Sequence, residues 1–221
     1  METDLNTLWE RLAPNESAVN SGLTQRRGEI IELWSLYQRR QPRVVLEIGT
    51  AQGGTFAGWC QLGHPEATII SIDRDTNDAR PRTGEPVHPA IYSGPLANTE
   101  NGGGLFCLRK HRQTIHAISG WSMNFGTTEK LKEILGDRTI DFLFHDASHE
   151  ATMFARDFEI YWPMVTKGGV FAAHDIARSA AQDCNKSVAW ERIKHDASYA
   201  YSYEYMAHSS FTEMGIGVLI K

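Results

Sequence analysis

The sequence predicts an α/β protein in which helices alternate with the strands of a doubly wound, mostly parallel seven-stranded sheet with an antiparallel edge strand. Short apolar runs of strand length recur at 44–48, 68–72, 114–118, 140–144 and 168–173. Segments with the 3.6-residue spacing of helices separate most of these runs. With 221 residues, 41% of them hydrophobic, the chain can bury one sizeable core. We therefore expect a single domain over residues 1–221.

Two helices are expected before the first strand. The first apolar face comprises Leu5, Leu8, Trp9 and Leu12, and the second comprises Ile30, Leu33, Trp34 and Tyr37. Pro42 ends the second helix. We assign 1–42 to a helical N-terminal extension that covers the sheet, caps the active site or forms a dimer face. Covering the sheet is the plainest role, and a homo-oligomer formed through these helices is also expected.

The segment 74–112 has little periodicity. It contains four prolines and the run Gly102–Gly104, and it stands where an ordinary doubly wound domain has a helix. Loops of this length are usually functional or disordered. We expect a mobile loop over the active site, with a short helix near 105–109, and we expect substrate choice to reside there.

The C-terminal half continues the alternation of helices and strands. Thr128–Leu135 is a predicted helix, and a second helix is expected to follow Asn185. Tyr199, Tyr201, Tyr203 and Tyr205 alternate as in a half-exposed strand, and 215–220 is the last strand.

Composition and charge limit the kinds of binding partner and the cellular compartment that we expect for this protein. The net charge is −5 without a long basic run, which argues against nucleic acid as the main partner. No apolar run approaches the roughly 18 residues of a membrane helix. The three cysteines are far apart and are expected to be free thiols in a reducing compartment. The first residues lack the pattern of a secretory signal, so a cytoplasmic location is expected.

A glycine-rich turn follows the first strand. Its glycines are spaced G-x-x-x-G-G from Gly49, which matches neither the G-x-G-x-x-G dinucleotide fingerprint nor a lysine-containing phosphate loop. Gly49 and Gly53 allow a ligand to approach the backbone, and Glu47 favours a ligand that carries positive charge. Asp73 ends the second strand about 20 residues later, where nucleotide folds bind ribose hydroxyls. A plain turn without a ligand, and a capping or turn role for Asp73, are the alternatives.

Four polar residues follow the fourth and fifth strands. Asp146 and His149 come after the fourth strand, and His174 and Asp175 come after the fifth. Because neighbouring parallel strands end at one edge, these side chains can meet and hold a divalent ion with open positions. The two aspartates suit Mg²⁺, whereas ligation by His174 would favour a transition metal such as Mn²⁺, Fe²⁺ or Zn²⁺. Alternatively, Asp146 caps the next helix, and His174 points to the opposite side from Asp175. His145 is expected to point into the fold.

The motif Val-Leu-Glu-Ile-Gly-Thr-x-x-Gly-Gly resembles the first motif of the class I S-adenosylmethionine-dependent methyltransferases. The segments 141–150, 157–163 and 167–176 look like the branch with cephalosporin hydroxylase-type proteins and macrolide sugar O-methyltransferases. The resemblance implies a Rossmann-like methyltransferase fold. It also implies Mg²⁺ bound by Asp146 and Asp175, with His149 as general base. His174 replaces an acid found in the macrolide enzymes, which leaves the metal and its ligand number open.

The resemblance further implies S-adenosylmethionine as cofactor. Glu47 would lie near its amine, Asp73 would bind its ribose, and Ser122 would border its adenine, with Gly49, Gly53 and Asp146 also at the cofactor. The acceptor would be a hydroxylated small molecule, such as a sugar, a catechol or a natural-product scaffold. The metal would lower the pKa of the acceptor hydroxyl, and His149 would remove its proton. A non-catalytic cofactor-binding component of an assembly and a nicotinamide-dependent oxidoreductase are the alternatives.

Overall fold

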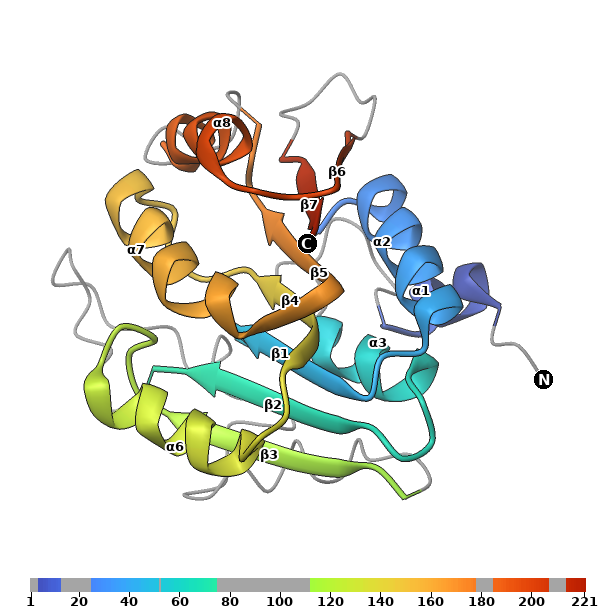
Figure 1. Ribbon diagram of the computed structural model, residues 1–221. Helices are drawn as coiled ribbons and strands as arrows, with labels where there is room; N and C mark the ends of the chain where they lie inside the picture. The colour runs from blue at the N-terminus through green and yellow to red at the C-terminus, as the bar shows by residue number, and fades with distance from the viewer. Residues whose placement is uncertain (1–3, 13–24, 52, 75–111, 178–184, 207–213) are drawn as a thin grey trace, which may run out of the picture.

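The computed structural model describes residues 4–12, 25–51, 53–74, 112–177, 185–206 and 214–221 (Figure 1). Its strands form one seven-stranded sheet in the order β3-β2-β1-β4-β5-β7-β6. Their bounds are β1 Val44–Ile48, β2 Thr68–Asp73, β3 Thr114–Ser119, β4 Ile140–His145, β5 Val165–His174, β6 Tyr201–Tyr205 and β7 Ile216–Ile220. The strands from β3 to β5 pair in parallel, and β7 runs antiparallel to both β5 and β6. The predicted fold class is confirmed, with the antiparallel strand beside the outermost strand β6.

Helices cover both faces of this sheet, which gives three layers (Figure 1). One face carries α1 Leu5–Leu12, α2 Arg27–Arg40 and α3 Gly54–Leu62. The other carries α6 Phe125–Leu135, α7 Ala151–Tyr161 and α8 Lys186–Asp196, with a short 3₁₀ turn at Trp162–Met164. Side chains of a strand alternate between the two faces, so Val45 packs into the first layer and Leu46 into the second.

The N-terminal helices cover the sheet, which is the plainest of their predicted roles. Trp9 and Trp34 are buried against the first layer, with ring centroids 6.5 Å apart. Trp59 of α3 packs against Phe142 and Phe144 of β4, at centroid distances of 5.3 and 5.5 Å. The apolar faces of α1 and α2 are therefore satisfied within one chain, and a homo-oligomer through them stays a prediction.

Some element bounds differ from those expected. α6 begins at Phe125, three residues before the predicted start. The sequence pattern missed this first turn because Phe125 is exposed and the turn has no apolar periodicity. β5 begins at Val165 and includes two glycines that the sequence pattern assigned to its start. The predicted loop 74–112 and the short helix within it lie almost wholly outside the described residues. Within the described residues, no helix has the length and apolarity needed to cross a membrane.

Three strand ends are joined at the carboxyl edge of the sheet. The Gly49 amide donates to the Ile72 carbonyl at 2.9 Å, and the Asp146 amide donates to the Ile48 carbonyl at 2.8 Å. Gly49 has φ 86°, and a Cβ there would collide with the Asp146 carbonyl group. Glycine is therefore required at this turn for two reasons, its backbone angle and the close approach of the β4 end.

Candidate active site

Asp73 holds the glycine turn in place. Its Oδ2 accepts hydrogen bonds from the Thr50 and Ala51 amides at 2.9 and 2.7 Å, and its Oδ1 accepts one from the Arg74 amide at 2.7 Å. The turn role that the sequence left open for Asp73 is therefore present. A carboxylate can accept about four hydrogen bonds, so capacity for a ribose hydroxyl remains. The predicted contact with ribose stays a prediction.

Glu47 is buried on β1 beneath this turn. Its Oε1 accepts hydrogen bonds from the Thr55 hydroxyl and from Trp59 Nε1, the latter at 3.0 Å. Its Oε2 is buried without a hydrogen-bond partner among the described residues. Burial raises the pKa of Glu47 to about 8, so the side chain is a neutral acid at pH 7. A cation placed beside Glu47, such as the predicted methionyl amine, would favour its ionised form.

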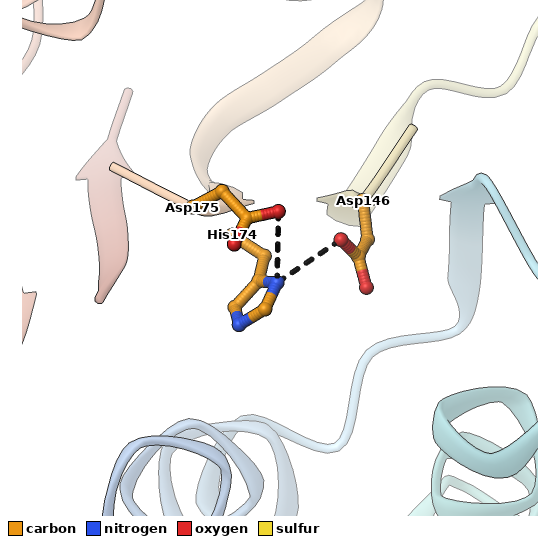
Figure 2. Close-up of side chains that lie close together, drawn as sticks. All are labelled: Asp146, His174 and Asp175. Atoms are coloured by element: carbon orange, nitrogen blue, oxygen red, sulfur yellow. Dashed lines mark hydrogen bonds and ion pairs between the residues drawn. The ribbon is translucent and has the colours of Figure 1, made fainter. Parts of the chain in front are cut away.

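Asp146, His174 and Asp175 meet at the ends of β4 and β5 (Figure 2). His174 Nδ1 lies 3.1 Å from Asp146 Oδ1 and 3.4 Å from Asp175 Oδ2. Alternation along a strand would send His174 and Asp175 to opposite sides. Asp175 instead adopts the left-handed region, with φ 60°, and this turn brings both side chains to Asp146.

The cluster is electrostatically coupled. Burial alone would lower the pKa of His174, but the carboxylates of Asp146 and Asp175 outweigh it and raise that pKa to about 10. Burial opposes ionisation of both aspartates, yet the imidazole lowers the pKa of Asp146, and the bonds to His149 and His174 lower that of Asp175. Without a bound ion, His174 is therefore a protonated imidazolium, and Asp146 and Asp175 are ionised carboxylates.

The donor set fits a divalent ion. One ligand atom from each of these three residues lies within 4.8 Å of the others. Ligands about 2.1 Å from one ion stand roughly 3.0 Å apart at a right angle and roughly 3.4 Å apart at a tetrahedral angle. The separations of 3.1 and 3.4 Å between His174 Nδ1 and the two carboxylate oxygens are compatible with these values, and they are also ordinary lengths for the ion pairs of the ion-free cluster. Three protein ligands would leave positions open for a substrate.

His149 approaches this cluster from the segment before α7. Its Nε2 lies 3.0 Å from Asp175 Oδ2, and 55% of its side chain is exposed. The hydrogen bond to Asp175 raises the pKa of His149. The sequence placed His149 and Asp146 on one pocket through their spacing of three residues. In the structure His149 pairs with Asp175, which belongs to the same cluster as Asp146.

The sequence profile of a methyltransferase-domain family matches residues 46–176, which is more than half of the chain. The chain belongs to this methyltransferase family. The match includes the glycine turn, Asp73, Asp146 and the end of β5. The predicted class I family is thereby confirmed, while the narrower branch stays a prediction. No curated protein matches the sequence significantly.

Solved structures support the same fold for this methyltransferase. An O-methyltransferase from Bacillus cereus in complex with SAH has a TM-score of 0.63 and 16% identity, covering 99% of this chain and 92% of its own. The O-methyltransferase TomG from Streptomyces achromogenes, involved in tomaymycin synthesis and bound to SAM, has a TM-score of 0.59 and 15% identity. That match covers 98% of this chain and 88% of TomG. At these identities the likeness shows the fold alone.

Two residues of the N-terminal segment reach the cluster of this methyltransferase and were not predicted. The Gln25 side-chain amide donates to Asp146 Oδ2. Glu29, on the first turn of α2, accepts a hydrogen bond from the Gly215 amide at 3.0 Å and has Oε2 3.8 Å from His174 Nε2. A signal for Glu29 was present, since it lies four residues before Leu33 on the buried face of the helix. Gln25 carried no such signal.

A buried polar network lies behind the cluster of the methyltransferase. Lys186 Nζ lies 3.0 Å from His145 Nδ1, and His145 Nε2 lies 3.0 Å from Asp157 Oδ2. Burial lowers the pKa of His145, so the neutral ring accepts from Lys186 and donates to Asp157. Ser122 donates its hydroxyl to the same Asp157 oxygen at 2.9 Å. His145 points into the fold as expected, but its contacts with Lys186 and Asp157 were not predicted. The predicted contact of Ser122 with adenine stays a prediction.

Proposed function

We propose that this protein is an S-adenosylmethionine-dependent, metal-assisted O-methyltransferase of a hydroxylated small molecule. A sugar, a catechol or a natural-product scaffold would serve as acceptor. The observation that carries the proposal is the cluster of Asp146, His174 and Asp175, with His149 bonded to Asp175, beside the glycine turn. The similar structures that hold SAH or SAM support the choice of cofactor.

The glycine turn is the proposed cofactor site. Gly49 and Gly53 both have positive φ and carry no Cβ that would keep a ligand from the turn, and Asp73 holds the turn from the end of β2. Glu47 would receive the positive charge of the methionyl amine, and Ser122 would border the adenine. The sulfonium of S-adenosylmethionine makes its methyl group electrophilic, so the protein needs to align an oxygen nucleophile and remove its proton.

Asp146, His174 and Asp175 would hold the divalent ion, and the ligand set is compatible with Mg²⁺, Mn²⁺ or another transition metal. When bound, such an ion supplies Lewis acidity that lowers the pKa of a chelated hydroxyl. Asp175 would have two roles, since its Oδ2 also contacts His149 Nε2.

His149 is the proposed general base. If Nε2 donates its proton to Asp175, Nδ1 carries the lone pair that accepts the proton of the acceptor hydroxyl. Its exposed position leaves room for a substrate on that side. A component that only binds the cofactor would have no use for such a base, and this favours catalysis over the non-catalytic alternative.

The proposal is tested with metal-stripped protein, S-adenosylmethionine and a panel of sugars, catechols and hydroxylated scaffolds, with mass spectrometry of the products. We expect addition of one methyl group that EDTA abolishes and Mn²⁺ or Mg²⁺ restores. Asp146→Asn should remove this restoration, and Asp196→Asn, on the exposed end of α8, should not. Undiminished transfer in excess EDTA would refute metal assistance. Cofactor binding without transfer to any acceptor would favour the binding component, and binding of NAD instead would favour the oxidoreductase.

A further inference from the structure

The two ring nitrogens of His174 face different surroundings. Nδ1 faces Asp146 and Asp175, and Figure 2 shows the other nitrogen, Nε2, directed away from both carboxylates. Nε2 is buried and makes no hydrogen bond with any residue that the structure describes. Glu29 Oε2 lies 3.8 Å from it, which is within the range of an ion pair but longer than a direct hydrogen bond.

Glu29 is held rigidly on the far side of His174 from the two aspartates. It is fully buried on the first turn of α2. Its Oε1 accepts the Gly215 amide at 3.0 Å, so the backbone before β7 fixes the carboxylate. Its other oxygen, Oε2, lies on the side of the imidazole of His174, so this buried carboxylate faces the ring edge opposite to the two aspartates.

We propose that Glu29 is a positioning residue that keeps the proton of His174 on Nε2 and presents Nδ1 as a metal ligand beside Asp146 and Asp175. Metal-binding histidines almost always donate their other ring N–H to a carboxylate, carbonyl or water, which fixes the tautomer and strengthens the ligand. This inference rests on the proposed metal centre, and it assigns the N-terminal segment a part in that centre.

The inference also decides between the two classes of metal. Mg²⁺ prefers oxygen ligands and near-ideal octahedral geometry, whereas an imidazole nitrogen suits Mn²⁺, Fe²⁺, Co²⁺ or Zn²⁺. A centre with one histidine and two carboxylates, oriented by an outer carboxylate, should therefore take a transition metal in preference to Mg²⁺. Loss of such an outer partner typically lowers metal affinity about 10- to 100-fold.

The experiment measures metal binding directly on the full chain, without substrate. Co²⁺ and Mn²⁺ are titrated into metal-free protein in competition with Mg²⁺, the Co²⁺ absorption bands are recorded, and nitrogen coupling to bound Mn²⁺ is measured by electron spin-echo spectroscopy. The wild type should show nitrogen coupling and prefer Co²⁺ and Mn²⁺. Glu29→Gln keeps the side-chain shape and an acceptor for Gly215, and it should weaken Co²⁺ binding by about 10- to 100-fold. Glu32→Gln, on the same helix, is the control and should change nothing.

His174→Asn provides a second measurement that does not depend on the folding of the Glu29 variant. It should abolish the nitrogen coupling and shift the preference toward Mg²⁺. If the wild type binds Co²⁺ or Mn²⁺ at this site but Glu29→Gln binds equally well, the role of Glu29 is overturned while the metal centre stands. If Mn²⁺ binds without nitrogen coupling, His174 is no ligand and the inference fails. If no metal binds the wild type, the metal-assisted function fails with it.

Discussion

Glu47→Gln should stabilise the cofactor-free protein at neutral pH, although it removes a residue assigned to the cofactor site. Burial raises the pKa of the Glu47 carboxyl to about 8 in the fold, from the ordinary value of 4.5 that applies in the unfolded chain. Below pH 4.5 both states hold the proton, and the contribution of the neutral acid to stability is fully present. As the pH rises toward 8, the unfolded state releases its proton while the folded state keeps it, so stability is lost.

The size of the effect follows from the shift. One pKa unit corresponds to about 1.4 kcal/mol, so the 2.5 units between 4.5 and pH 7 amount to roughly 3 kcal/mol, as an order of magnitude. A glutamine at this position would not titrate, and its carbonyl oxygen would still accept hydrogen bonds from Thr55 and Trp59. Most of this loss should therefore disappear in the variant.

The assay is urea unfolding of wild type and variant at about pH 5 and about pH 7. The variant should gain stability relative to the wild type mainly at the higher pH, by roughly 2–3 kcal/mol more than at the lower. Glu133→Gln, exposed on α6, should show no such difference. Equal pH dependence in wild type and Glu47→Gln would refute the conclusion that Glu47 is a buried neutral acid.

Three further outcomes are expected. The reaction rate should rise with pH through the pKa of His149, which the bond to Asp175 raises above 6.5. His149→Ala should abolish this rise of rate with pH and lower kcat by about 10²–10⁴-fold, with cofactor affinity nearly unchanged. If excess metal restored the rate of this variant, another residue would be the base. Asp73→Ala should weaken S-adenosylmethionine binding by about 1–3 kcal/mol in calorimetry, because it removes the acceptor of two turn amides, and undiminished affinity would contradict this role. Phe142→Ala should cost about 3–5 kcal/mol in denaturant unfolding, because its buried ring contacts Tyr37 and Trp59, and a loss below about 1 kcal/mol would contradict the assigned packing.

The sequence was sufficient to predict the strands and the residues at their ends, because apolar periodicity marks where each strand lies. The apolar runs located the strands, and the rule that parallel strands end at one edge brought Asp146 and Asp175 together. The alternation rule failed to place His174 and Asp175 relative to each other, because the left-handed φ of Asp175 interrupts the strand geometry. A single non-glycine residue with positive φ is not evident from sequence pattern.

Contacts between residues that are far apart in the sequence could not be predicted, for a different reason. Gln25 and Asp146 are 121 positions apart, and a local pattern holds no information about which distant segment covers a strand end. Lys186 is the first residue of α8, and no motif in the sequence singled it out. Its full burial against His145 arises only when α8 packs beside α7 on the finished sheet.

The family profile spans 46–176, yet groups that surround its acidic cluster come from both sides of that span. Glu29 precedes it, and Lys186 and Gly215 follow it. A chimera that exchanged only the shared segment between two family members would carry over the acids and replace the groups that orient them. Divergence outside the shared segment can therefore retune the chemistry of the centre while the recognisable motif stays constant. Exchanging the flanks alone would be the more direct way to alter the metal preference of the proposed centre by recombination.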